Sequence, residues 1–144
     1  MTAIPPTIQI RAATVDDLEA VDAIQRACPE AANWKVVEYL DQEFQVAIVD
    51  NRIGGFIVTR RVFEDEREIL NLAVAPELRR RGVAGALLLH CLESFEGSVF
   101  LEVRASNHAA IKFYKYHNFQ EVSRRAKYYQ NPTESAIVMK FHSC

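Results

Sequence analysis

The sequence predicts an α/β fold, in which a mixed, mostly antiparallel sheet of about six to seven strands carries helices on both faces. Two observations lead to this prediction. Hydrophobic residues make up 49% and charged residues 25% of the 144 residues, the balance of a globular protein with a hydrophobic core. Segments with strand and helix periodicity follow one another in the order β-α-α-β-β-β-α-β-α-β-β. No linker, repeat or low-complexity tract divides residues 1–144, so we expect a single domain.

The N-terminal segment is expected to form a strand and two helices. Residues 7–14, TIQIRAAT, alternate between apolar and polar side chains as a strand does. A helix should follow, because Thr14 is an N-cap residue with Asp17 three positions later. Its buried face is predicted to contain Leu18, Val21, Ile24 and Cys28. A shorter helix is expected over residues 35–40.

The middle of the chain is expected to form a hairpin and then a buried strand. Residues 44–62 contain two strand-like runs joined by a turn at Asp50-Asn51-Arg52. The pair Gly54-Gly55 marks a β-bulge or a close approach of another backbone segment. An acidic turn at residues 64–68 precedes the mostly buried strand ILNLAVAP, which ends at Pro76.

The C-terminal half continues the alternation of strands and helices. A helix is expected from about Val83 to Ser94, and the strand SVFLEVR follows over residues 98–104. A further helix begins after Asn107 and ends near His117. The last two strands are expected over residues 119–122 and 136–141.

Charge and cysteine content exclude several classes of protein. The net charge of −2 and the pI of about 6.1 provide no general attraction to nucleic acid or to anionic lipid. The N-terminus lacks the features of a signal peptide, and the longest aliphatic run, 83–91, is too short to span a bilayer. Cys28, Cys91 and Cys144 show no spacing typical of disulfides or zinc sites, and the four histidines show no metal spacing. We therefore expect a cytoplasmic protein without a metal.

The basic stretch RRRG, Arg79 to Gly82, lies between a buried strand and a helix. Backbone N–H groups at such a turn lack helical partners, and the helix dipole adds positive potential there. Small residues at Gly82, Ala84 and Gly85 would let an anion approach the backbone. The residues alone leave two interpretations open, a phosphate cradle and a solvated basic loop.

Three stretches resemble a known family. LAVAPELRRRGVAGALL, residues 72–88, resembles the acetyl-CoA signature of the GNAT N-acetyltransferases, Arg/Gln-x-x-Gly-x-Gly/Ala, with Arg79, Gly82 and Ala84 at the motif positions. Residues 101–119, LEVRASNHAAIKFYKYHNF, and 124–139, RRAKYYQNPTESAIVM, resemble the RimI branch. That branch acetylates the N-terminal alanine of small-subunit ribosomal protein number eighteen. The resemblance implies the GNAT fold across almost the whole chain.

The resemblance also implies roles for particular residues. Glu102 matches the general base of the family and Tyr114 its general acid, and Trp34 falls near the acceptor side. The backbone of Leu72, Ala73 and Val74 would contact the pantetheine arm and the thioester oxygen. The remaining implied acetyl-CoA contacts are Arg79, Arg80, Arg81, Gly82, Val83, Ala84, Gly85 and Asn107.

The chemistry of amine acetylation requires these two residue types. An α-amine has a pKa of about 8, so it arrives mostly protonated at neutral pH and a carboxylate must accept its proton. The leaving CoA thiolate needs a proton, which a phenol with a reference pKa of about 10 can supply. The implied partners are acetyl-CoA as co-substrate and the N-terminal segment of a ribosomal protein, without direct contact to nucleic acid or membrane. Nothing in the sequence indicates an oligomeric state.

Each implied role has a structural alternative. Glu102 could be an outward residue of an alternating strand, Tyr114 a packing residue of an amphipathic helix, and Asn107 a helix N-cap. Two positions also depart from the family pattern. Asn118 occupies a position that is often glycine, which asparagine can replace in a left-handed turn, and Ala84 replaces the second glycine of Gly-x-Gly.

Three functions remain open at this point. The first is a peptide α-amine acetyltransferase of the RimI type. The second is a GNAT enzyme that acts on a lysine side chain or a small-molecule amine. The third is a non-catalytic acyl-CoA-binding module, which the presence of both Glu102 and Tyr114 disfavours.

Overall fold

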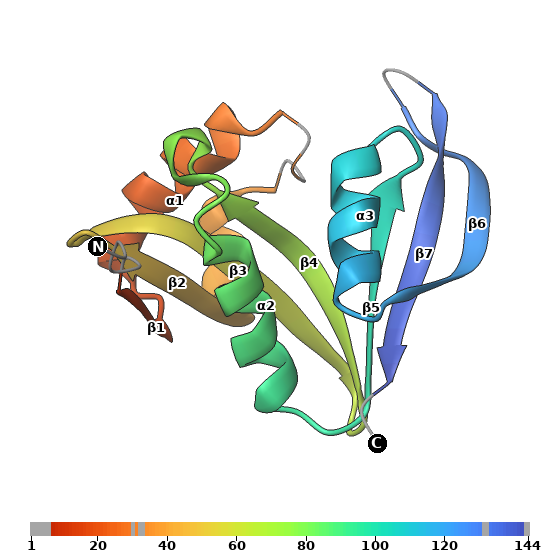
Figure 1. Ribbon diagram of the computed structural model, residues 1–144, viewed down its shortest axis with the longest axis horizontal. Helices are drawn as coiled ribbons and strands as arrows, with labels where there is room; N and C mark the ends of the chain where they lie inside the picture. The colour runs from red at the N-terminus through yellow and green to blue at the C-terminus, as the bar shows by residue number, and fades with distance from the viewer. Residues whose placement is uncertain (1–6, 30, 32–33, 131–132, 143–144) are drawn as a thin grey trace, which may run out of the picture. The chain divides into compact units, whose positions relative to one another are not determined.

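The computed structural model describes residues 7–29, 31, 34–130 and 133–142 (Figure 1). Within them, a seven-stranded sheet has the strand order β1-β2-β3-β4-β5-β7-β6. The strands are β1 Ile8–Ala12, β2 Glu43–Val49, β3 Arg52–Phe63, β4 Glu66–Val74, β5 Ser98–Arg104, β6 Gln120–Tyr129 and β7 Glu134–His142. The α-helices are α1 Leu18–Ala27, α2 Val83–Glu93 and α3 His108–Tyr116. The short 3-10 helices of the described residues are η1 Val15–Asp17, η2 Val36–Asp41 and η3 Pro76–Leu78. The predicted α/β fold with a mixed sheet is confirmed.

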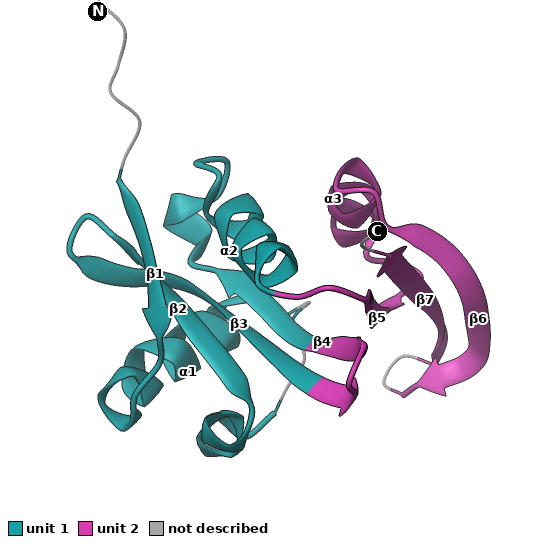
Figure 2. Cartoon of the chain, turned by 90° about the horizontal axis from the view of Figure 1, so that it is seen from below, with its two compact units in different colours: residues 1–60, 70–94 teal, residues 61–69, 95–144 magenta. Residues whose placement is uncertain are grey.

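The chain separates into two compact units (Figure 2). Unit 1 comprises residues 1–60 and 70–94, and unit 2 comprises residues 61–69 and 95–144. Strand β4 contributes residues to both units. The expectation of a single domain over residues 1–144 stays a prediction.

In unit 1, β1 pairs with β2 and β2 with β3, both antiparallel. The β2–β3 turn is shorter than predicted. Asp50 and Asn51 form it with φ angles of 52° and 64°, and Arg52 is already the first residue of β3. Two successive left-handed residues match the twist of the flanking strands, which explains why two residues suffice.

The two glycines of β3 make both a bulge and a close approach. Ala47 lies opposite Gly55 while Ile48 lies opposite Ile53, so Gly54 is the extra residue of a bulge. A Cβ on Gly54 would lie 2.6 Å from Leu78 Cδ1, and one on Gly55 would lie 3.0 Å from the Ala73 carbonyl oxygen. The glycines therefore let the end of β4 and helix η3 approach β3.

Helices α1 and α2 cover opposite faces of the unit 1 strands, as the two views show (Figures 1 and 2). The predicted start at Thr14 is confirmed, because the Asp17 carboxylate accepts a 2.8 Å hydrogen bond from the Thr14 N–H. The first turn is 3-10 rather than α-helical. Leu18 is half-buried, while the rest of the predicted stripe is buried. The buried side chains of α1 and α2 and of the residue after α1 include Val21, Ile24, Cys28, Val83, Leu87, Leu88 and Cys91.

In unit 2, β7 lies between β5 and β6 and is antiparallel to both (Figure 1). Residues Glu66–Glu68 of β4 pair in parallel with Ser98–Phe100 of β5. Helix α3 contributes Tyr114, whose ring lies 5.3 Å from that of Phe119. Asn118 has a φ of 69°, which confirms the left-handed turn predicted after this helix.

Two sequence predictions in unit 2 were wrong in extent. Strand β6 runs to Tyr129 rather than ending at Val122, and nine of its ten residues are exposed. An exposed strand buries neither face, so residues 123–129 lack the apolar alternation that indicates a strand. Glu66 and Glu68 belong to β4 rather than to an acidic turn, and both are half-buried. At these residues β4 pairs with β5, a partner distant in sequence.

Candidate active site

The turn that links β4 to α2 has the backbone of an anion-binding loop. Arg80 and Gly82 have φ angles of 66° and 80°, with a residue of negative φ between them. Alternation of this kind turns successive N–H groups toward one side. The first hydrogen bond of α2 runs from the Ala86 N–H to the Gly82 carbonyl, at 3.0 Å. The N–H groups of Val83, Ala84 and Gly85 come before it and have no acceptor within the helix.

The surroundings of this turn leave room above its backbone. Gly82 is exposed, and a Cβ placed on it would meet no atom within 4 Å. Two arginine side chains of the turn have contacts within unit 1. Arg79 Nη2 lies 3.6 Å from the Cys28 sulfur, and Arg81 Nη1 lies 3.6 Å from the Asp50 carboxylate. Backbone amides rather than arginine side chains are therefore the more defined donors at this turn.

The end of β4 already bonds to neighbouring side chains at two of the predicted backbone groups. The Leu72 N–H donates a 3.0 Å hydrogen bond to the Asn71 side-chain oxygen. The Cys28 thiol donates to the Val74 carbonyl at 3.4 Å. Any pantetheine contact at residues 72–74 would therefore compete with these bonds or use the other backbone groups.

A buried polar cluster supports this strand end, and sequence patterns did not indicate it. Gln25 Oε1 accepts hydrogen bonds from the Tyr39 hydroxyl at 2.6 Å and from Asn71 Nδ2 at 3.1 Å. Gln25 Nε2 donates a 2.6 Å bond to the Trp34 carbonyl. Burial raises the pKa of Tyr39, while the Asn71 hydrogen bond opposes that effect. The cluster ties α1, η2 and the segment of Trp34 to β4, so the half-exposed Trp34 is anchored through its backbone.

In unit 2, Glu102 lies on β5 with a side chain that is 15% exposed. Its Oε1 is 3.2 Å from Arg125 Nη1. The Tyr128 hydroxyl bonds to the same carboxylate. The negative charge of Glu102, this hydrogen bond and burial raise the pKa of Tyr128, against the effect of Arg125. No sequence pattern indicated Arg125 and Tyr128 as neighbours of Glu102, although both lie in the stretch RRAKYY, residues 124–129.

Asn107 and Tyr114 occupy the two ends of α3. The Asn107 side chain accepts a 3.1 Å hydrogen bond from the Ala110 N–H, so Asn107 is the N-cap of the helix. Tyr114 is buried, and its ring lies 5.2 Å from that of Phe113. The structural alternatives considered for both residues are therefore observed, and their roles toward a substrate stay predictions.

A second charged cluster lies beside Glu102 on the same sheet. Glu134 Oε1 accepts hydrogen bonds from Arg104 Nη1 and Ser106 Oγ, each at 3.1 Å, and Oε2 accepts from the Ser106 N–H at 3.2 Å. The guanidinium of Arg104 also stacks on Tyr129, with Cζ 4.4 Å from the ring centroid. Nothing in the sequence pattern indicated this cluster.

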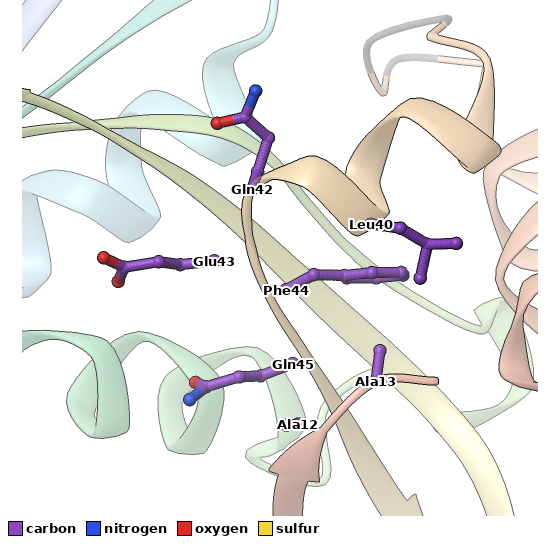
Figure 3. A pocket seen from close by; sticks show the side chains of 7 residues that line it. All are labelled: Ala12, Ala13, Leu40, Gln42, Glu43, Phe44 and Gln45. Atoms are coloured by element: carbon purple, nitrogen blue, oxygen red, sulfur yellow. The ribbon is translucent and has the colours of Figure 1, made fainter. Parts of the chain in front are cut away.

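A pocket of about 300 Å³ lies at the start of β2 in unit 1 (Figure 3). Glu43 and Gln45 point to one side of the strand and Phe44 to the other (Figure 3). The pocket contains none of the predicted site residues; its lining is Ala12, Ala13, Leu40, Gln42, Glu43, Phe44 and Gln45.

In the part of the chain that the structure describes, no helix is long and apolar enough to cross a bilayer. The same residues contain no cluster of three or more His, Cys, Asp or Glu side chains suited to a metal ion.

Comparison with known proteins relates this geometry to a family. Residues 13–119 match the family described as acetyltransferase (GNAT) family. The chain is 40% identical over 96 residues to the ribosomal protein bS18-alanine N-acetyltransferase of Salmonella typhimurium, a match that covers 62% of this chain and 64% of that protein. The match thus spans less than two thirds of that relative's length. An N-alpha-acetyltransferase of Saccharolobus solfataricus is 30% identical over 152 aligned positions and covers 91% of both chains.

The similarity extends to solved structures. The crystal structure of the ribosomal-protein-S18-alanine N-acetyltransferase from Escherichia coli superposes with a TM-score of 0.83 at 29% identity, covering 96% of both chains. The family match includes the strands and helices from α1 to α3 and the turn after β4. The chain belongs to the acetyltransferase (GNAT) family.

Proposed function

We propose that this protein transfers the acetyl group of acetyl-CoA to the free N-terminal α-amine of an acceptor protein, with alanine as the residue acetylated. The observation that carries the proposal is the backbone of the turn after β4. Left-handed φ angles at Arg80 and Gly82, open space above Gly82 and the free start of α2 suit a pyrophosphate group. Acetyl-CoA would supply the activated acetyl group. The residues that would hold it are Leu72, Ala73, Val74, Arg79, Arg80, Arg81, Gly82, Val83, Ala84, Gly85 and Asn107.

Glu102 and Tyr114 would carry out the two proton transfers. The Glu102 carboxylate takes a proton from the acceptor ammonium, directly or through a water molecule. The neutral amine nitrogen then bonds to the acetyl carbon as the carbon–sulfur bond breaks. Tyr114 gives its proton to the leaving thiolate, and the acceptor nitrogen loses its second proton to water, which leaves a neutral amide. The half-buried position of Glu102 supports the base role, because the carboxylate keeps access to solvent while three of its neighbours are polar side chains of β6.

The N-terminus of small-subunit ribosomal protein eighteen is the acceptor that we propose. The support is the similarity to the Salmonella typhimurium and Escherichia coli enzymes that are named for this substrate. Such an acceptor implies a cytoplasmic site of action. Cys28 and Cys91 are thiols rather than halves of disulfides, which fits that compartment.

The acceptor class is tested by incubating the protein with acetyl-CoA and short peptides that begin Ala-Arg. N-blocked peptides and peptides with an internal lysine serve as controls. We expect acetylation of the free N-terminal alanine, because the lysine ammonium, with a reference pKa of about 10.4, holds its proton more tightly. Mass spectrometry locates the acetyl group. Products mainly on lysine would assign the protein to side-chain acetylation, and binding of acetyl-CoA without any product would assign it to the non-catalytic class.

A further inference from the structure

Two carboxylates and two arginines share one face of the unit 2 sheet. Ala136 of β7 lies opposite Arg104 of β5 and opposite Arg125 of β6, so both arginines flank a small residue in one cross-strand row. Glu102 lies two residues before Arg104 on β5, and Glu134 lies two residues before Ala136 on β7. Residues two apart on a strand point to the same face, roughly 7 Å apart. Both carboxylates are therefore close to the row of arginines.

The two arginines divide between the two carboxylates. Arg125 Nη1 lies 3.2 Å from Glu102, whereas Arg104 Nη1 lies 3.1 Å from Glu134. Arg104 is held in place by two further contacts, a 3.3 Å hydrogen bond to the Gln130 carbonyl and the stacking on Tyr129. The Arg104 guanidinium, which is two residues from Glu102 on the same strand, is thus paired with Glu134 instead of Glu102.

Several hydrogen bonds hold the Glu134 carboxylate in its ion pair with Arg104. Its side chain is 16% exposed and accepts hydrogen bonds from Ser106 and Arg104. The Ser106 side chain first, and Arg104 after it, lower the pKa of Glu134, which favours the ionised carboxylate. The arginine that remains for Glu102 is far more exposed, 58% for Arg125 against 33% for Arg104. An ion pair with an exposed partner is weak and easily exchanged.

We propose that Glu134 is a positioning residue, which holds the Arg104 guanidinium away from Glu102 and so leaves Glu102 with a counter-ion, Arg125, that an acceptor ammonium can displace. The inference rests on the proposed acetyl transfer. The charged and titratable groups around Glu102 in unit 2 are Arg104, Arg125, Tyr128, Tyr129, Glu134 and, through its effect on Tyr128, Glu68. Among these, the Arg104 charge is the one that Glu134 neutralises.

Glu134→Gln tests the proposal, because glutamine can still accept the hydrogen bond from the Ser106 N–H while the negative charge is lost. The Arg104 charge would then stabilise the Glu102 anion and compete with the acceptor ammonium. We expect kcat/KM for an Ala-Arg peptide to fall about tenfold near neutral pH. The acidic limb of the pH profile of kcat/KM should move to lower pH by on the order of one pH unit. The KM for acetyl-CoA should stay close to that of the wild type.

Arg104→Met should have the opposite effect, because the Glu134 anion would then repel the Glu102 anion and move the acidic limb to higher pH. The double variant Glu134→Gln/Arg104→Met should return the limb toward the wild-type position. Asp22→Asn is the matched control, since it removes a carboxylate that pairs with Arg26 on the surface of α1, and its profile should not move. A loss of the same factor at every pH, or shifts of the same sign in both single variants, would overturn the inference.

A titration of Tyr129 gives a readout that does not depend on acetylation. Burial is the main cause that raises its pKa, and Glu102 and Glu134 raise it further while Arg104 lowers it. The phenol should therefore titrate at lower pH in Glu134→Gln and at higher pH in Arg104→Met. If the wild type acetylates no peptide while Tyr129 shifts as expected, the charge arrangement stands and the proposed function fails. If Tyr129 is unchanged in both variants, the proposed role of Glu134 fails whatever the activity.

Discussion

Arg125 and Glu102 lie on strands that β7 separates, yet the arginine Nη1 is 3.2 Å from the carboxylate Oε1. Ala136 lies opposite Arg125 on the intervening strand, so a small side chain borders the path of the guanidinium arm. The proposed base is thus placed beside a cation of similar charge to the acceptor ammonium. Its surroundings already accommodate a positive group.

Glu102→Gln should depress kcat/KM most strongly at low pH, where few acceptor amines are neutral. A positioned base typically contributes about a hundred- to ten-thousand-fold, and raising the pH should recover part of the loss because more amine is already deprotonated. A pH–rate profile from pH 6 to 9 measures both effects. Near wild-type activity of the variant at pH 6 would remove Glu102 from the base role. The variant should also lower the pKa of Tyr128, since the Glu102 charge is the main cause that raises it.

Tyr114→Phe should give a different pH dependence. The substitution keeps the ring that packs 5.3 Å from Phe119 and removes the hydroxyl alone. A more basic medium supplies no substitute proton donor for the leaving thiolate, so the defect should persist or deepen as the pH rises. Acetyl-CoA affinity, measured by equilibrium binding, should change little. A profile of the same shape as that of Glu102→Gln would show that the acid and base are assigned wrongly.

Gly82→Val should raise the KM for acetyl-CoA by about tenfold or more, and by more than Arg80→Ala does. A valine at a φ of 80° is strained, and the turn must distort to relieve it. The position itself is open, so the effect arises from the backbone rather than from a collision within the protein. Steady-state kinetics with varied acetyl-CoA measures the change, and thermal unfolding checks that the variant is folded. A larger effect of Arg80→Ala would show that side chains bind the phosphates.

Asp17→Asn should destabilise the protein at neutral pH and much less in acid. Two hydrogen bonds from Arg11, at 2.7 and 2.9 Å, are the main cause that lowers the pKa of Asp17 to about 2. A depressed folded-state pKa contributes stability above the unfolded value near 4, and this contribution is lost as the pH falls toward 2. We expect a difference of about 1–2 kcal/mol at pH 7, because Arg11 is half-exposed and its charge is partly screened. Urea unfolding at pH 7 and pH 2.5 measures it, and an equal difference at both values would contradict the assignment.

The sequence by itself determined the elements whose causes are local. The N-cap at Asn107, the left-handed turn at Asn118 and the small residues of the turn after β4 follow from backbone preferences of single residues and short motifs. Hydrophobic periodicity gave the order of strands and helices, since each element buries one side on the core. The same local signals placed Glu102 and Tyr114 on a strand and a helix that the structure confirms.

Only the tertiary structure decided which side chains meet at these positions. Strand β7 follows β6 in sequence but lies between β5 and β6 in the sheet. The partners of Glu102 and Arg104 therefore come from residues more than twenty positions away. Arg125, the partner of Glu102, lies on β6, a strand without apolar periodicity. The buried cluster of Gln25, Tyr39 and Asn71 arises in the same way from three separate elements. Such contacts depend on strand register and packing, which no short stretch of sequence contains.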